Sequence, residues 1–124
     1  MTAAAWIGFL VAAGIGAPAR FVIDGWIEDR VGDDFPWGTL VVNVTGCLAL
    51  GVLTGLARSH GLGSTAGTII GTGGLGAYTT FSTFTFETVR LVEEGELKFA
   101  LGNVAASMAL GLAAAALGIA VVSF

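Results

Sequence analysis

The sequence predicts an all-α integral membrane protein with four transmembrane helices, the third of them broken in the middle of the membrane. Hydrophobic residues make up 55% of the 124 residues and charged residues only 11%, against about 25% charged residues in soluble domains. A helix that spans a bilayer needs about 20 apolar residues, and four such stretches nearly exhaust the chain. We therefore expect a single transmembrane domain over residues 1–124, with spans at about 4–23, 38–57, 65–90 and 99–122.

Charge and cysteine content exclude several classes of function. Five Lys and Arg stand against nine Asp and Glu, a net charge of −4, so the chain has no basic strip for nucleic acid. The one cysteine, Cys47, falls in the second predicted span, which leaves no disulfide framework and no cysteine-based metal site. The one histidine, His60, lies in a short turn without a second ligand nearby, so we expect a solvated side chain.

The first span begins like a secretory signal, but it lacks the positively charged leader that such a signal needs. We therefore expect a mature helix. Gly14, Gly16 and Ala17 form a small-residue face suited to close helix contact. Arg20 follows near the end of the span, where two interpretations stay open. It is either an arginine that snorkels to the interface or a charge in a vestibule that attracts anions.

Polar residues recur on one face of the second and fourth predicted spans. In the second span Thr39, Asn43 and Gly46 follow one another at i, i+4 and i+7, hence on one stripe. An asparagine in hydrocarbon must find a partner, so Asn43 points into the protein, either as hydrogen-bonding glue between helices or as part of a pore lining. The stripe of the fourth span suits close packing and a narrow path equally; it consists of Asn103, Ser107, Gly111 and Gly118.

The third span contains the most unusual stretch of the chain, GTGGLGAYTTFSTFTFE over residues 71–87. Glycine destabilises a helix interior, and Thr and Ser hydroxyls compete for backbone hydrogen bonds. We expect the helix to break between about Gly74 and Thr79 and to resume from about Thr80. Because lipid offers no hydrogen-bond partners, a break is tolerated only where its carbonyls and amides are buried in protein or line a watery cavity. The break is therefore a candidate ion site.

Aromatic and polar side chains follow the expected break on two neighbouring faces. Phe81 and Phe84 are three residues apart and share one face, while Thr80, Thr83 and Glu87 form a polar stripe beside it. An aromatic ring has a positive edge, so two such edges can hold an anion. The spacing alone, however, favours core packing of both phenylalanines.

Orientation in the membrane is weakly encoded. Basic residues divide three to one between the connections on opposite sides, with Arg30, Arg90 and Lys98 on one side and Arg58 on the other. The positive-inside rule therefore leans only slightly toward both termini outside. A chain with so small a bias can insert both ways, and two opposed copies would assemble as an antiparallel pair. A partner chain of different orientation is the alternative.

The chain resembles the CrcB (Fluc) family of fluoride channels in motif, order and length, over essentially all of its residues. The resemblance rests on three motifs, one in each of the first three spans: Gly16-Ala17-x-x-Arg20-Phe21, Gly38-Thr39-Leu40-x-x-Asn43-x-x-Gly46, and Gly76-x-x-Thr79-Thr80-Phe81-Ser82-Thr83-Phe84-x-x-Glu87.

The resemblance implies a dual-topology, antiparallel homodimer in the cell membrane, or a pair with a paralogous subunit, through which cytoplasmic fluoride leaves passively. It further implies that the backbone carbonyls of Gly76 and Thr79 from both copies hold one structural sodium ion that is not transported. For the fluoride pathway, the resemblance implies the ring edges of Phe81 and Phe84, Asn43 as a donor, and a polar track of Ser82, Thr83 and Ser107. For a vestibule or gating charge it implies Arg20 and Glu87.

Two positions depart from the family pattern. Asn103 and Phe21 stand where many members have Tyr, which puts in doubt the hydroxyl contacts expected there.

Three other classes of protein are alternatives to a channel. A small multidrug exporter also has four spans and dual topology, but it needs a carboxylate in the middle of the first span, and residues 1–23 contain none. A non-transporting packing subunit would explain the glycines but not the clustered Thr, Ser and Asn. An intramembrane hydrolase fits least, because no Gly-x-Ser-x-Gly element is present, and we expect no enzymatic activity.

Overall fold

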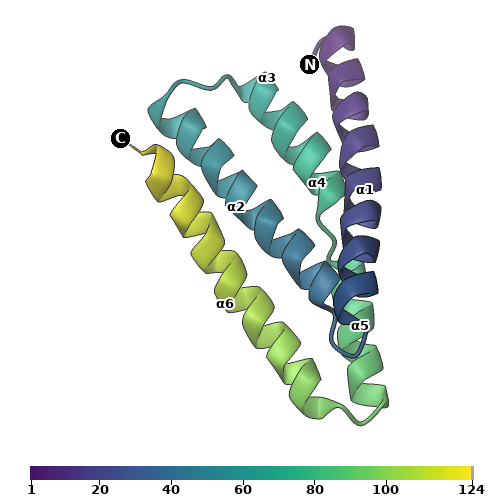
Figure 1. Cartoon of the computed structure of the whole chain (residues 1–124). Helices are drawn as coiled ribbons and strands as arrows, with labels where there is room; N and C mark the ends of the chain where they lie inside the picture. The colour runs from purple at the N-terminus through teal and green to yellow at the C-terminus, as the bar shows by residue number, and fades with distance from the viewer. Residues whose placement is uncertain (124) are drawn as a thin grey trace.

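The computed structural model describes residues 1–123, and helices arranged as membrane-crossing rods make up most of them (Figure 1). Three helices are long and apolar enough to cross a membrane: α1 (Ala3–Val31), α2 (Trp37–Ser59) and α6 (Leu97–Val122). The fourth segment, which we call the third membrane segment after its place in the chain, is interrupted. It consists of α3 (Ser64–Gly67), η1 (Thr68–Leu75), α4 (Gly76–Tyr78) and α5 (Ser82–Glu93). The expected four-segment, all-α architecture is thus confirmed.

The helix α1 is longer than the first predicted span. It continues to Val31 and ends at Gly32, whose φ of 82° suits glycine and whose N–H donates to the carbonyl of Glu28. The predicted end of the first span at residue 23 was therefore about eight residues too early for the helix. Hydropathy falls at Asp24, but helical hydrogen bonds need no apolar side chains and continue beyond the hydrocarbon region.

The other spans agree more closely with the prediction. The helices α2 and α6 begin and end within about two residues of the expected bounds. The connection that the span bounds leave over residues 91–98 is shorter than predicted, because α5 continues to Glu93 and α6 begins at Leu97. Gly95, with a φ of 79°, makes the reversal between them.

Glycines set the closest contacts between helices. A side chain at Gly51 of α2 would place its Cβ 2.2 Å from the carbonyl oxygen of Ala115 in α6, so these two helices touch along their backbones. Gly16 of α1 is buried, and a Cβ there would lie 2.2 Å from the carbonyl oxygen of Gly74 in the third membrane segment. Small residues at such crossings are how membrane helices approach closely without a hydrophobic driving force.

The small and polar stripe predicted for α6 is present. Asn103, Gly111 and Gly118 are buried against the neighbouring helices, and Ser107 is half-buried. The small-residue face predicted for α1 is only partly used, because Gly14 has open space around it.

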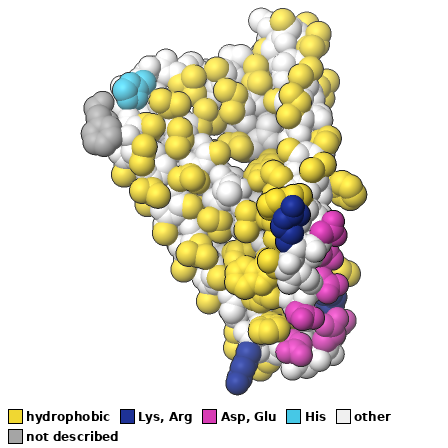
Figure 2. Space-filling model, in the orientation of Figure 1, with side chains coloured by type: hydrophobic (Ala, Val, Ile, Leu, Met, Phe, Trp, Pro, Cys, Tyr) yellow, Lys and Arg dark blue, Asp and Glu magenta, His cyan; other side chains and the backbone are white. Residues whose placement is uncertain are grey.

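Charged groups are divided unequally between the two ends of the molecule. All nine Asp and Glu residues lie in what we call the acidic end, residues 24–34 and 87–98, where α1 and α5 end and α2 and α6 begin. Figure 2 shows carboxylates gathered at one end of the visible face and the histidine at the other. The opposite end, at the connection between α2 and α3, carries Arg58 and His60. The chain is therefore electrically asymmetric from one end of its long helices to the other.

Candidate functional site

The third membrane segment does not break where its glycines cluster. Residues Thr68–Leu75 form a π-helix, a rare form that tends to occur at functional sites. The N–H of Gly76 donates to the carbonyls of Gly71 and Gly73, so the glycine stretch stays hydrogen-bonded. The predicted break at Gly74–Thr79 was therefore placed too early. A π-helix keeps the peptide groups of the glycine stretch hydrogen-bonded inside the membrane, whereas a break there would leave them unpaired.

The break itself covers residues 79–81. Thr79 is extended, with φ −81° and ψ 162°, and it ends α4, although its N–H still donates to the carbonyl of Leu75 at 2.9 Å. The next helix, α5, begins at Ser82 and not at Thr80. Phe81 therefore belongs to the break, while Phe84 lies in the first turn of α5. Figure 1 shows this segment as the thin link between α4 and α5.

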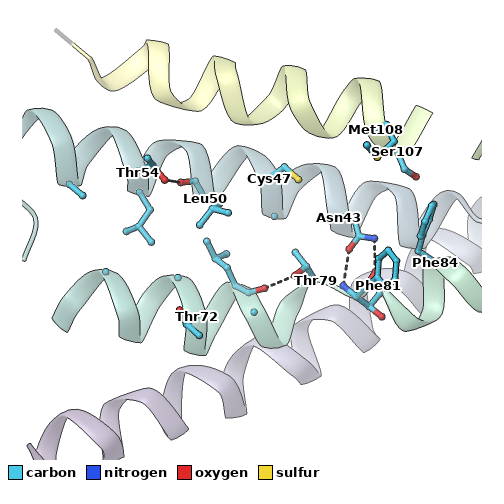
Figure 3. A pocket seen from close by; sticks show the side chains of 18 of the residues that line it. Asn43, Cys47, Leu50, Thr54, Thr72, Thr79, Phe81, Phe84, Ser107 and Met108 are labelled. Carbon is cyan, nitrogen blue, oxygen red and sulfur yellow. Dashed lines mark hydrogen bonds between the residues drawn. The ribbon is translucent and has the colours of Figure 1, made fainter. Parts of the chain in front are cut away.

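The side chain of Asn43 pairs with both backbone groups of Thr80. Asn43 Nδ2 donates to the Thr80 carbonyl at 2.8 Å, and the Thr80 N–H donates to Asn43 Oδ1 at 2.8 Å (Figure 3). The side-chain amide thus takes the place of a second peptide group beside the interrupted helix. Because an unpaired peptide group costs several kcal/mol in lipid, this pairing makes the break tolerable at membrane depth.

The hydroxyl of Thr80 supports the first turn of α5 through a hydrogen bond. Thr80 Oγ1 accepts from the N–H of Thr83 at 3.1 Å, so it pairs one of the otherwise free amides in the first turn of α5 from two residues before the helix. It also donates to Thr83 Oγ1 at 3.0 Å and lies 3.3 Å from Ser82 Oγ. The three hydroxyls form one small network, in which Thr80 is 9% exposed.

Four backbone carbonyls beside the break, those of residues 76–79, have no donor among the described residues. Among residues 1–123, no N–H or side-chain donor is paired with the carbonyl oxygens of Gly76 and Thr79. In a continuous α-helix they would accept from residues four positions further on. These are the two carbonyls that the resemblance assigns to a cation.

The predicted polar stripe of α2 is the face that packs on the third membrane segment. Thr39 is 2% exposed and donates to the Glu87 carboxylate at 2.5 Å. Three residues beyond Asn43, Gly46 leaves room for Thr79, whose Cγ2 would lie 2.2 Å from a Cβ at that position. The expectation that this stripe points into the protein is confirmed.

A groove of about 720 Å³ lies between α2, the third membrane segment and α6. Figure 3 shows the phenylalanines and Asn43 close together at one end of it. The ring centroids of Phe81 and Phe84 are 5.9 Å apart, and Phe81 is 76% exposed. Ser107 Oγ is buried without a hydrogen-bond partner among the described residues. The groove brings together six predicted site residues: Asn43, Gly76, Thr79, Phe81, Phe84 and Ser107.

Four other predicted site residues do not line this groove. Ser82 and Thr83 belong to the hydroxyl network of Thr80. Glu87 accepts a hydrogen bond from the hydroxyl of Thr39. Both residues lie one to two helical turns nearer the acidic end than the pair of Asn43 and Thr80. Arg20 is half-buried on α1, and its Nε is buried without a hydrogen-bond partner among residues 1–123.

The two positions that depart from the family pattern are also outside the groove. Asn103 is 1% exposed, and its Nδ2 donates to Thr88 Oγ1 at 2.9 Å. Thr88 Oγ1 in turn donates to the carbonyl of Phe84 at 2.8 Å. Asn103 therefore ties α6 to α5 behind the phenylalanine. Phe21 is 81% exposed and points away from the body of the chain.

Some groove residues were not predicted. On α2 the groove continues beyond Asn43 along Cys47, Leu50 and Thr54, and the third membrane segment contributes Thr72. The three α2 residues follow Asn43 at steps of four, three and four, so extending the Asn43 stripe along the helix would have found them. Thr72 has no such signal, because the π-helix changes the residue spacing.

The sequence comparisons agree with one another. A family model described as CrcB-like protein, Camphor Resistance (CrcB), matches residues 7–119. The chain is 48% identical over 118 residues to fluoride-specific ion channel FluC 2 of Mycobacterium tuberculosis (strain CDC 1551 / Oshkosh), covering 95% of this chain and 90% of the relative. It is 46% identical over 114 residues to fluoride-specific ion channel FluC 1 of Streptomyces avermitilis, covering 92% of each. For FluC 1 of Symbiobacterium thermophilum the identity is 44% over 117 residues, covering 93% and 94%.

The helices and the comparisons together define a multi-pass membrane protein. The chain belongs to the CrcB family.

The contact between Gly46 and Thr79 yields a testable prediction. In Gly46→Ala the new methyl group would collide with Thr79 Cγ2, 2.2 Å away, and we expect a loss of stability of about 1–3 kcal/mol in detergent. The double variant Gly46→Ala/Thr79→Ser removes the opposing methyl and keeps the hydroxyl that donates to Leu75, so it should recover most of the loss. Thermal unfolding of both proteins measures this. Equal stability of Gly46→Ala and the parent protein would contradict the contact.

Proposed function

We propose that the chain forms a fluoride-specific channel that lets fluoride leave the cell passively across the plasma membrane. Membership of the CrcB family and the names of its relatives, which are fluoride-specific ion channels, support fluoride as the substrate. The observation that carries the proposal is the group of Phe81, Phe84, Asn43 and Ser107 in one groove beside a broken helix. A passive channel makes and breaks no covalent bonds, so the proposal includes no enzymatic activity.

The chemistry of the groove suits a small anion. Aromatic rings have positive edges, and the rings of Phe81 and Phe84 lie 5.9 Å apart between centroids. Ser107 Oγ is a buried hydroxyl without a partner among the described residues, so it is free to donate to an anion. Asn43 Nδ2 has a second proton besides the one given to Thr80. A narrow path lined by hydrogen-bond donors and ring edges can replace the hydration shell of fluoride. The same path would be too narrow for larger halides.

The same proposal includes a structural sodium ion, which would not be transported. The residues fit such an ion because Gly76 and Thr79 offer carbonyl oxygens that accept no hydrogen bond from residues 1–123. Carbonyl oxygens are hard ligands, and the end of α4 is the negative end of a helix dipole. One chain supplies two such oxygens, so a second copy would supply the others. When bound, the ion would fix the two interrupted segments against each other.

The proposed assembly is an antiparallel homodimer, and a paralogous partner of opposite orientation is the alternative. The charge asymmetry of the chain supports opposed copies. Two parallel copies would bring two acidic ends, with nine carboxylates each, to the same side of the membrane. Opposed copies instead place the acidic end of one beside the end that carries Arg58 in the other. Like charges brought together are unfavourable, although salt screens part of the effect.

Fluoride efflux from liposomes tests the substrate and the role of the rings. Vesicles containing the purified protein should release fluoride when potassium permeability is supplied by an ionophore, and chloride should not substitute. Phe81→Ile and Phe84→Ile remove the ring edges, so each should slow efflux by about tenfold. Phe86→Ile is the matched control: Phe86 is 69% exposed and does not line the groove, so its variant should keep the parent rate. Efflux equal to that of protein-free vesicles would end the fluoride proposal.

Labelling from one side of the membrane tests the antiparallel assembly. A Gly63→Cys variant in a Cys47→Ser background places one thiol in the connection between α2 and α3, where a Cβ meets nothing within 4 Å. In intact cells, an impermeant maleimide should label about half of the copies if both orientations are present. Labelling of nearly all or nearly none of the copies would contradict a homodimer of opposed copies and would favour a differently oriented partner.

A further inference from the structure

Two polar side chains beside the break, those of Asn43 and Thr80, redirect the backbone hydrogen bonds of the third membrane segment. In a continuous α-helix, the N–H of residue i donates to the carbonyl of residue i−4. The N–H of Thr80 would then donate to Gly76, and the N–H of Thr83 would donate to Thr79. Neither bond exists in the structure.

Both donors are paired with side chains instead. The Thr80 N–H donates to Asn43 Oδ1 at 2.8 Å. The Thr83 N–H donates to the hydroxyl of Thr80 at 3.1 Å. Each redirected donor would otherwise pair with one of the carbonyls that have no partner beside the break. Asn43 thus accounts for the free carbonyl of Gly76, and the Thr80 hydroxyl accounts for that of Thr79. The carbonyls of Ala77 and Tyr78 also have no donor among residues 1–123.

We infer that Asn43 and the Thr80 hydroxyl are positioning residues that keep the Gly76 and Thr79 carbonyls free for the cation. This inference rests on the proposed function for its sodium ion, but the replacement of backbone acceptors by side-chain acceptors that it describes lies within one chain. Asn43 therefore acts first on the backbone, through both atoms of its amide, and a contact with fluoride is left to its one remaining proton.

The two groups also connect the cation site to the ring pair. Asn43 Nδ2 holds the Thr80 carbonyl, and the next residue along the chain is Phe81. The Thr80 hydroxyl fixes the first turn of α5, which contains Phe84. The same three hydrogen bonds thus set the position of the carbonyls on one side of the break and of the rings on the other.

Amide hydrogen exchange at Thr80 tests the first pairing directly, without reference to any ion. In detergent micelles, the Thr80 amide should exchange about tenfold faster in Asn43→Leu than in the parent protein, because its acceptor is gone. Asn43→Asp keeps an acceptor oxygen and should keep the protection. Asn103→Leu removes a second buried asparagine that does not touch the break, so Thr80 exchange should stay at the parent rate. Equal exchange rates in Asn43→Leu and the parent protein would overturn the inference.

Sodium-dependent thermal stability tests the consequence for the carbonyls. The parent protein should melt at a higher temperature in sodium chloride than in potassium chloride of equal strength. The increment should be lost in Asn43→Leu and in Thr80→Val, and it should return in Thr80→Ser, which keeps the hydroxyl. A full sodium increment in both Asn43→Leu and Thr80→Val would overturn the inference. Absence of any increment in the parent protein would instead remove sodium from the proposed function, and the exchange rates alone would then decide the inference.

Discussion

The pairing of one asparagine side chain with one backbone residue is the interaction on which the rest of the structure depends. A helix interrupted inside a membrane exposes peptide groups that lipid cannot satisfy. Asn43 satisfies two of them at Thr80, through two hydrogen bonds of 2.8 Å each. Without this pairing, the chain would gain most by closing the helix from Gly76 through Phe84. The free carbonyls would then be paired, and Phe81 would lose its position in the break.

Close helix contacts make that pairing possible. Asparagine has a short side chain, so α2 must lie almost against the break, and Gly46 allows this by giving its space to Thr79. On the other side, Gly16 of α1 lies against the carbonyl of Gly74 and supports the π-helix that precedes the break. The glycines of this chain therefore act mainly by permitting approach, and the interruption is made by the polar side chains that the approach brings together.

The sequence was sufficient for the architecture and for six of the residues that line the groove. Hydropathy alone predicted the four segments, and the i, i+4, i+7 spacing of Thr39, Asn43 and Gly46 predicted which face of α2 points inward. It was not sufficient for the position of the break. Glycine content favoured a break from about Gly74 to Thr79, but the break covers residues 79–81, because hydrogen-bond partners on another helix decide where peptide groups can be left unpaired.

Other features depended on tertiary contacts that no local pattern records. The π-helix over Thr68–Leu75 and the pairing of Asn103 with Thr88 are examples. The family resemblance supplied the importance of Gly76 and Thr79, but not the reason that these two carbonyls are free. That reason lies in the acceptors of the Thr80 and Thr83 N–H groups, which are the side chains of Asn43 and Thr80.

The most direct measurement of the central claim is an experimental structure of the protein in lipid nanodiscs, at a resolution that shows carbonyl oxygens. The account predicts that residues 79–81 are not helical, that Thr80 is paired with the amide of Asn43, and that the Gly76 carbonyl accepts no backbone donor. An unbroken α-helix through these residues, with the Thr80 N–H bound to Gly76, would contradict it.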